Sequence, residues 1–138
     1  MQATEDEVRS ILEGARTIAV VGLSDNPMRP SHGVARYLRA SGYRIVPVNP
    51  NLRELWGEPA YPDLRAVAAA GLRIDLVDVF RDPALVGPIV DDAIAIGAPA
   101  IWFQEGVVNE PAAAKARAAG LRVVMDRCTM KDHARLVR

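Results

Sequence analysis

Residues 17–22 read Thr-Ile-Ala-Val-Val-Gly, a continuous apolar run that ends in glycine. A strand covered on both faces in a parallel sheet has this kind of sequence, because neither face meets water. Residues 23–30 then contain two prolines, an aspartate and an asparagine, which is the composition of a loop. Ser31 is expected to cap a helix that runs to about Ser41 and stops at Gly42. The segment therefore predicts a buried strand, a loop and a helix in succession.

The same unit repeats along the chain. Apolar strands are also predicted at 43–48, 74–80, 99–103 and 121–125. Helices are predicted at 4–14, 62–71, 83–96 and 109–120, with an irregular segment at 51–60 and a short amphipathic tail at 129–138. Strands that alternate with helices in this way indicate the α/β class and a parallel sheet.

The pattern predicts one domain over residues 1–138, with a doubly wound, Rossmann-like parallel sheet and helices on both faces. About five main strands are expected, in the order 3-2-1-4-5. Residues near Ala60-Tyr61 supply the short edge strand, or else only an extended loop. In such sheets ligands bind beyond the carboxyl ends of the strands, where the strand order reverses.

The composition excludes several classes of protein. Lys and Arg number 17, as do Asp and Glu, so the chain lacks the basic excess of a nucleic-acid or anionic-lipid binder. No apolar run approaches the roughly 18 residues of a membrane helix, and the acidic start of the chain is unlike a signal peptide. One cysteine precludes an intramolecular disulfide and, with two distant histidines, argues against a zinc site. These features favour a cytoplasmic protein with no nucleic-acid, membrane or metal partner.

The loop after the first strand has the composition of a phosphate site. Gly22 ends the strand, and the Ser24 and Ser31 hydroxyls can donate hydrogen bonds. Arg29 can bind a phosphate through two N–H groups. The following helix begins with free backbone N–H groups and a positive dipole end, and Gly33 in its first turn allows close approach. The alternative is a plain capped loop that binds nothing.

This loop departs from the dinucleotide fingerprint Gly-x-Gly-x-x-Gly, because Ser24 stands at the place of the second glycine. The second strand ends in Val48-Asn49-Pro50, with no carboxylate for the ribose hydroxyls before Glu54. The P-loop pattern is also absent from the sequence. Only the predicted fold therefore supports the alternative of an NAD(H)-binding enzyme or redox switch.

Six short motifs occur in order along the chain. They are Val-Val-Gly-Leu-Ser at 20–24, Arg-Pro-Ser-His-Gly at 29–33, Pro-Val-Asn-Pro at 47–50, Asp-Val-Phe-Arg at 78–81, Trp-Phe-Gln-Glu-Gly-Val at 102–107 and Met-Asp-Arg-Cys at 125–128. Together they resemble the small stand-alone CoA-binding proteins of bacteria, over about Ile11 to Arg135. The fold of that family is similar to the N-terminal CoA-binding domain of the succinyl-CoA synthetase alpha subunit.

The resemblance implies CoA as cofactor and assigns it a set of binding residues. The phosphates are held at the first loop and helix start, by Gly22, Leu23, Ser24, Arg29, Ser31, His32 and Gly33. Asn49 and Pro50 border the adenosine, and Arg53 is the nearest basic substitute for a synthetase lysine whose position here is Leu52. Phe80 and Arg81 flank the pantetheine arm, and Gln104, Glu105 and Gly106 lie near its far end.

Three residues keep two interpretations each. His32 either donates to a phosphate or caps the helix turn. Cys128 is either a small packed residue or, beside Arg127, a thiol of lowered pKa that forms a mixed disulfide with CoA. Trp56 either packs the segment 52–57 or covers the adenine.

The leading hypothesis is a non-catalytic protein that holds CoA or an acyl-CoA at the C-terminal ends of the strands. It has no assigned catalytic residue and no metal. Such a protein buffers, senses or delivers the cofactor, or serves a separate acyl-CoA-forming or acyl-CoA-using protein. The alternatives are the NAD(H)-binding enzyme or redox switch, and a protein-interaction module whose cleft is empty.

Overall fold

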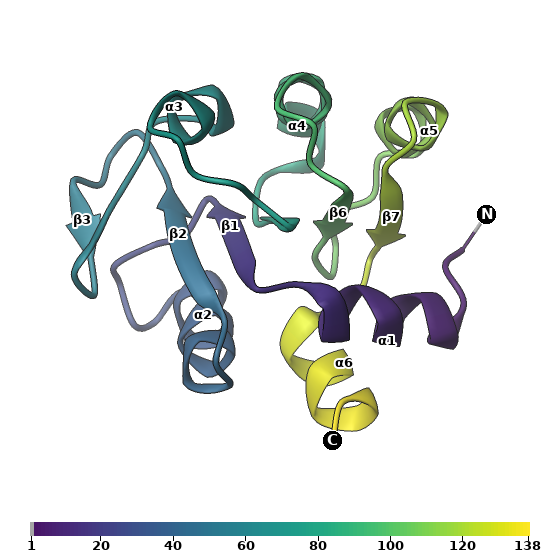
Figure 1. The fold of residues 1–138 in the computed structure, drawn as a ribbon, viewed down its shortest axis with the longest axis horizontal. Coiled ribbons are helices and arrows are strands. Elements are labelled where there is room, and N and C mark those ends of the chain that lie inside the picture. The colour runs from purple at the N-terminus through teal and green to yellow at the C-terminus, as the bar shows by residue number, and fades with distance from the viewer. Residues whose placement is uncertain (1) are drawn as a thin grey trace.

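A parallel sheet of five strands forms the centre of the computed structural model, which describes residues 2–138 (Figure 1). Its strands are β1 (Thr17–Val21), β2 (Arg44–Val48), β5 (Leu76–Val79), β6 (Ala100–Phe103) and β7 (Arg122–Met125), in the order β2-β1-β5-β6-β7. Tyr61 makes an isolated parallel bridge to Val48 and so supplies the predicted short edge. Numbered along the chain, these five strands lie in the order 2-1-3-4-5. The predicted order 3-2-1-4-5 is found only when the Tyr61 edge is counted as the third strand, and β7 then lies beyond it as a sixth.

Helices cover both faces of the sheet, as the doubly wound pattern predicts. They are α1 (Glu5–Gly14), α2 (Pro30–Ala40), α3 (Leu64–Ala69), α4 (Val86–Ala95) after the 3₁₀ turn η1 (Pro83–Leu85), α5 (Glu110–Ala118) and α6 (Thr129–Leu136). Helices α3, α4 and α5 lie on one side, and α1, α2 and α6 lie on the other (Figure 1). The Rossmann-like α/β fold is therefore confirmed.

Alternation along β1 divides the core between the two faces. Ala19 and Val21 pack with the apolar residues of α3, α4 and α5, whereas Ile18 and Val20 pack with those of α1 and α2. Every second side chain of a strand points to the same face, so a strand that is apolar throughout fits only between two helical layers. The apolar run that predicts this strand thus also explains the layered fold.

One predicted segment differs from the structure. Residues 51–60 were expected to be irregular, but β3 (Glu54–Leu55) and β4 (Glu58–Pro59) pair as a small antiparallel hairpin. Trp56 and Gly57 form its turn with φ of 53° and 82°. Strands of two residues are too short to show a periodic pattern, which is why the sequence reasoning missed them.

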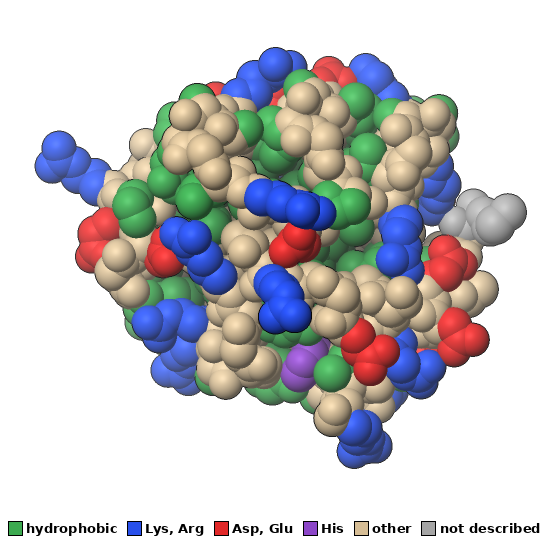
Figure 2. Space-filling model, in the orientation of Figure 1, with side chains coloured by type: hydrophobic (Ala, Val, Ile, Leu, Met, Phe, Trp, Pro, Cys, Tyr) green, Lys and Arg blue, Asp and Glu red, His purple; other side chains and the backbone are tan. Residues whose placement is uncertain are grey.

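The surface carries charges of both signs. On the face shown in Figure 2, Lys and Arg side chains stand beside Asp and Glu side chains rather than in one basic field. Within residues 2–138, no helix is long and apolar enough to cross a bilayer. The same residues contain no group of three His, Cys, Asp or Glu side chains suited to a metal ion.

Candidate functional site

A cavity of about 630 Å³ lies where β1, β5 and β6 end and their loops diverge. This is within the usual range for small-molecule sites, roughly 300–1,000 Å³. Several elements line it, through Gly22, Ser24, Arg29, Pro30, Ser31, Val34, Asn49, Phe80, Arg81, Gln104, Glu105, Val107 and Cys128. The cavity lies at the strand ends, where the fold rule directs the search.

Gly22 brings two of these loops into direct contact. Its φ is 88°, and a Cβ built on it would lie 2.1 Å from the carbonyl oxygen of Phe80. The Gly22 N–H donates to Val48 O, and the Phe80 N–H donates to Val21 O, each at 2.8 Å. Only glycine allows the first loop to pass so close to the end of β5.

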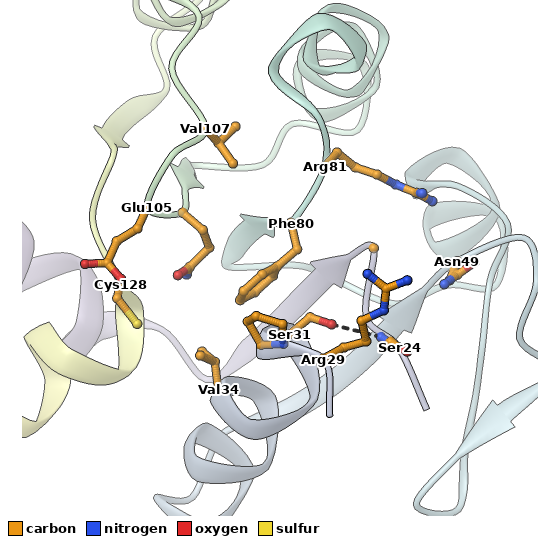
Figure 3. A pocket seen from close by; sticks show the side chains of 13 residues that line it. Ser24, Arg29, Ser31, Val34, Asn49, Phe80, Arg81, Glu105, Val107 and Cys128 are labelled. Atoms are coloured by element: carbon orange, nitrogen blue, oxygen red, sulfur yellow. Dashed lines mark hydrogen bonds between the residues drawn. The ribbon is translucent and has the colours of Figure 1, made fainter. Parts of the chain in front are cut away.

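The first loop is held by its serines in a way the sequence did not predict. The N-cap of α2 is Arg29, with Pro30 in the first turn, so the expectation that Ser31 caps this helix is wrong. Instead, the Ser31 hydroxyl accepts a hydrogen bond from the Ser24 N–H at 3.1 Å (Figure 3). No side chain caps α2. Pro30 has no N–H and the His32 N–H donates to Arg29 O at 3.1 Å, so among the first three residues of the helix the Ser31 N–H is the one left to a ligand.

Two guanidinium groups line one side of the cavity. Arg29 comes from the first loop and Arg81 from the end of β5, and both lie on the side that holds Ser24 and Asn49 (Figure 3). Neither has a carboxylate within 4.0 Å among residues 2–138, whereas Glu105 of the cavity wall pairs with Lys131 at 3.0 Å. An anion could therefore bind these two cations without displacing an ion pair.

The opposite side of the cavity is less polar. Figure 3 shows Cys128, Val107 and Glu105 across the Phe80 ring from Arg81. Val34 and Val107 are buried apolar residues. Val107 ends the motif at 102–107, whereas no sequence pattern marks Val34 as part of a site. The cavity thus changes along its length from a cationic side to a side where Val107 and the Cys128 sulfur adjoin the Glu105 carboxylate.

Cys128 itself is 6% exposed. Burial raises the pKa of its thiol, and the backbone N–H groups of Lys131 and Met130 only partly oppose this. The interpretation in which Arg127 lowers this pKa is wrong, because the Arg127 guanidinium lies 2.7 Å from Asp132 and 3.1 Å from Glu5. The packed interpretation of the thiol is the one that its burial supports.

A buried polar cluster lies beneath the cavity, and the sequence reasoning missed it as a unit. Asp78 is fully buried in β5, and its carboxylate accepts hydrogen bonds from Gln104 Nε2 and Thr129 Oγ1. Burial raises the pKa of Asp78 to about 7, although these two hydrogen bonds act in the opposite direction. The available signal was a lone carboxylate inside the apolar strand Leu76–Val79.

Of the predicted binding residues, the structure brings Gly22, Ser24, Arg29, Ser31, Asn49, Phe80, Arg81, Gln104 and Glu105 to this cavity. Pro50 instead lines a neighbouring cavity of about 140 Å³ that also contacts Arg81. Leu23 is buried, and its carbonyl accepts a hydrogen bond from Asn49 Nδ2 at 3.0 Å.

The remaining predicted residues do not line the cavity. His32 is buried, with its ring edge-on to Trp56 at 5.1 Å between ring centres. Gly33 and Arg53 are exposed. The Gly106 N–H donates to the Asp126 carboxylate at 2.7 Å. For Trp56, the contact with His32 and an Arg39 guanidinium 5.7 Å from its ring indicate a packing role.

The fold and this cavity define a Rossmann-like domain with a cofactor-sized site at the ends of its strands. The chain belongs to the CoA binding domain family, whose pattern matches residues 16–134. It is 38% identical over 128 residues to the uncharacterized protein YneT of Bacillus subtilis strain 168, covering 93% of each chain.

Two solved structures are also similar. A hypothetical protein from Pyrococcus horikoshii OT3 is 39% identical with a TM-score of 0.91, over 99% of this chain and 94% of that one. A Thermus thermophilus protein, cell-free ID.343, is 38% identical with a TM-score of 0.87, over 97% of this chain and 99% of that one. Both likenesses span nearly the whole fold.

Proposed function

We propose that the protein binds CoA or an acyl-CoA in this cavity and carries out no chemistry on it alone. The observation that carries the proposal is the pair Arg29 and Arg81, two cations without acidic partners in residues 2–138 at a cavity of a CoA binding domain. A CoA diphosphate bound between the first loop and the uncapped start of α2 would supply the negative charge that these two guanidinium groups lack.

The rest of the ligand follows from this placement of the diphosphate. The pantetheine arm would cross the Phe80 ring toward Gln104 and Cys128, on the less polar side of the cavity. The adenosine would extend past Asn49 toward Pro50, and Arg53 would serve its 3′-phosphate. Gly106 and His32 would then support the site from its edges rather than from its wall.

The lining side chains also favour binding without catalysis. Glu105 is engaged by Lys131, and burial raises the pKa of the Cys128 thiol, so neither is an activated base or nucleophile. A protein of this kind would present its cofactor to a separate acyl-CoA-forming or acyl-CoA-using protein.

The competing ligand is a nicotinamide dinucleotide on the same fold. Strand β2 ends at Val48 and is followed by Asn49, so the acidic residue that usually holds the ribose is not there. A protein-interaction module with an empty cleft is the other alternative.

The test is native mass spectrometry of the purified protein with CoA, acetyl-CoA, NAD and ATP added separately, followed by calorimetry. A mass shift with the CoA species only is the expected result. A shift with NAD but not CoA would reverse the ranking, and no shift at millimolar ligand would favour the interaction module.

A further inference from the structure

The Gln104 side chain is more than nine-tenths buried, yet half of its amide lacks a partner. Its Nε2 donates to Asp78 Oδ1 at 2.5 Å and to Thr129 Oγ1 at 2.9 Å, which uses both of its protons. No group in residues 2–138 donates to Gln104 Oε1. Most polar atoms of so buried a side chain have a hydrogen-bond partner, so the direction of this open acceptor calls for an explanation.

The free oxygen faces the cavity. Every fully buried side-chain nitrogen or oxygen within the described residues has a hydrogen-bond partner, so Oε1 must reach accessible surface. Gln104 is only 4% exposed and lines the cavity wall. The only surface that such a side chain can offer is therefore the wall of the cavity.

The Gln104 side-chain amide cannot flip while Asp78 accepts hydrogen bonds. Asp78 Oδ2 accepts from the Thr129 hydroxyl at 3.0 Å, and Oδ1 accepts from the amide nitrogen. A reversed amide would place Oε1 against the carboxylate, with acceptor facing acceptor. Asp78 and Thr129 come from β5 and α6, so two elements distant in sequence fix one orientation of the Gln104 side chain.

We propose that Asp78 and Thr129 are positioning residues that lock Gln104 with its carbonyl oxygen toward the cavity, where it accepts an amide N–H from the pantetheine arm. The inference rests on the proposed function and deepens it. Of the parts of CoA, the pantetheine arm is the one that carries amide N–H donors. Gln104 follows β6 whereas Asn49 follows β2, and β1 and β5 lie between these two strands in the sheet. The site thus recognises an amide-bearing arm and not only a nucleotide.

Calorimetry with two ligands tests this proposal. One is CoA, and the other is adenosine 3′-phosphate 5′-diphosphate, the nucleotide half without the arm. Gln104→Leu is expected to weaken CoA binding about tenfold, the scale of one hydrogen bond, and to change binding of the nucleotide half by less than about twofold. Retained nucleotide binding also reports an intact fold.

The positioning role has its own variants. Thr129→Val is expected to weaken CoA binding selectively, whereas Thr129→Ser keeps the hydroxyl and binds like the natural protein. Asp78→Asn is expected to lower the ratio of CoA to nucleotide affinity, and Asp75→Asn, three residues earlier, is expected to leave it unchanged.

Two results would overturn the inference while leaving the proposed function intact. They are unchanged CoA affinity in Gln104→Leu, and an equal loss of affinity for both ligands, which indicates a merely structural role. Failure of the natural protein to bind CoA would instead remove the proposed function itself, and the inference with it.

Discussion

Strand β5 has an aspartate near each end, and the two are in opposite circumstances. Asp75 precedes the strand, and its Oδ2 accepts hydrogen bonds from the N–H groups of Arg16 and Thr17 at 3.0 and 2.9 Å. Its Oδ1 lies 3.7 Å from Arg73 Nε, and its side chain remains 22% exposed. Asp78 is fully buried, has no cation within 4.0 Å in residues 2–138, and is bonded only by neutral groups.

The difference indicates that Asp75 stabilises the fold, whereas Asp78 orients a residue of the cavity. Asp75 links the start of β5 to the start of β1 with little desolvation cost, because its carboxylate remains partly in water and lies near Arg73. Asp78 carries a desolvation cost that no ion pair offsets, and in return it orients a side chain of the cavity wall. The start of the sheet is thus built for stability, and under the proposed function its end is built for a ligand.

The largest effect is expected from adding an atom where the first loop touches the end of β5. Gly22→Ala adds a Cβ 2.1 Å from Phe80 O at a φ of 88°, and should lower the free energy of unfolding by about 3 kcal/mol or more. Gly71→Ala, at the other end of the sheet, has a similar φ of 83° but no atom within 4 Å of the new Cβ. It should cost only about 1 kcal/mol. Urea denaturation measures both, and equal losses would contradict the close-contact argument.

A smaller loss, in affinity rather than stability, is expected at the cationic side. Arg29→Ala should weaken CoA binding by about 1.5–3 kcal/mol, roughly 10- to 150-fold, because a charge-assisted hydrogen bond is lost. Arg73→Ala removes another exposed arginine, which lies at the opposite end of the sheet and outside the cavity, and should leave CoA affinity unchanged. Calorimetry compares them. If Arg29→Ala binds CoA normally, Arg29 does not belong to the site.

The two aspartates should also differ in how pH acts on stability. Burial raises the pKa of Asp78 from 3.8 to about 7, so the folded state favours its protonated form. The stability that this group contributes is fully present below about pH 4 and is lost as pH rises through about 7. The unfolding free energy of Asp78→Asn should therefore rise relative to the natural protein by up to about 1.4 kcal/mol per pH unit in that window.

Denaturation at several pH values between 4 and 8 measures this difference, in which the titration of all other groups cancels. Asp75→Asn is the matched control, because Asp75 is partly exposed and shares its charge with Arg73. A difference curve for Asp78→Asn that is flat, or that slopes the other way, would show that Asp78 is not a destabilised buried carboxylate.

The smallest effect is expected at the apolar side of the cavity. Cys128→Ser should change CoA affinity by less than about 0.5 kcal/mol, since the thiol acts there as a packed group. The raised pKa also means that the native thiol should react with a disulfide reagent at pH 7 much more slowly than in the urea-unfolded chain. A CoA mass adduct that disappears in Cys128→Ser would instead support the mixed-disulfide interpretation.

Much of the fold could be predicted because its signals are local. Apolar runs such as Thr17–Val21 mark strands, and the strand–helix alternation leaves few right-handed arrangements of a parallel sheet. The hairpin at 54–59 was missed because its strands of two residues show no periodic pattern, and its ion pair between Arg44 and Glu58 joins residues that are far apart in the sequence. Ser31 was misread as a cap because Pro30 fits the first helical turn and moves the cap to Arg29.

The candidate site could be predicted only as a set of loops. Arg29 and Arg81 come from different loops, and each follows or ends a strand where the fold places ligands. Pro50 and Arg53 belong to the same stretch as Asn49, yet they do not line the main cavity. The direction of each side chain depends on the path of its loop, which short-range sequence patterns do not specify.

By itself, the sequence determined the class of fold and the edge of the sheet that carries the cavity, because periodicity is a local property. That Gly22 must be glycine depends on its contact with Phe80 O, which the tertiary structure creates. Only the tertiary structure decided that Asp78, Gln104 and Thr129 meet beneath one cavity. Gln104 and Thr129 lie 26 and 51 residues from Asp78. Residues so far apart meet only when parallel strands and a closing helix pack together, and the cost of burying a carboxylate is then offset by partners that no local pattern reveals.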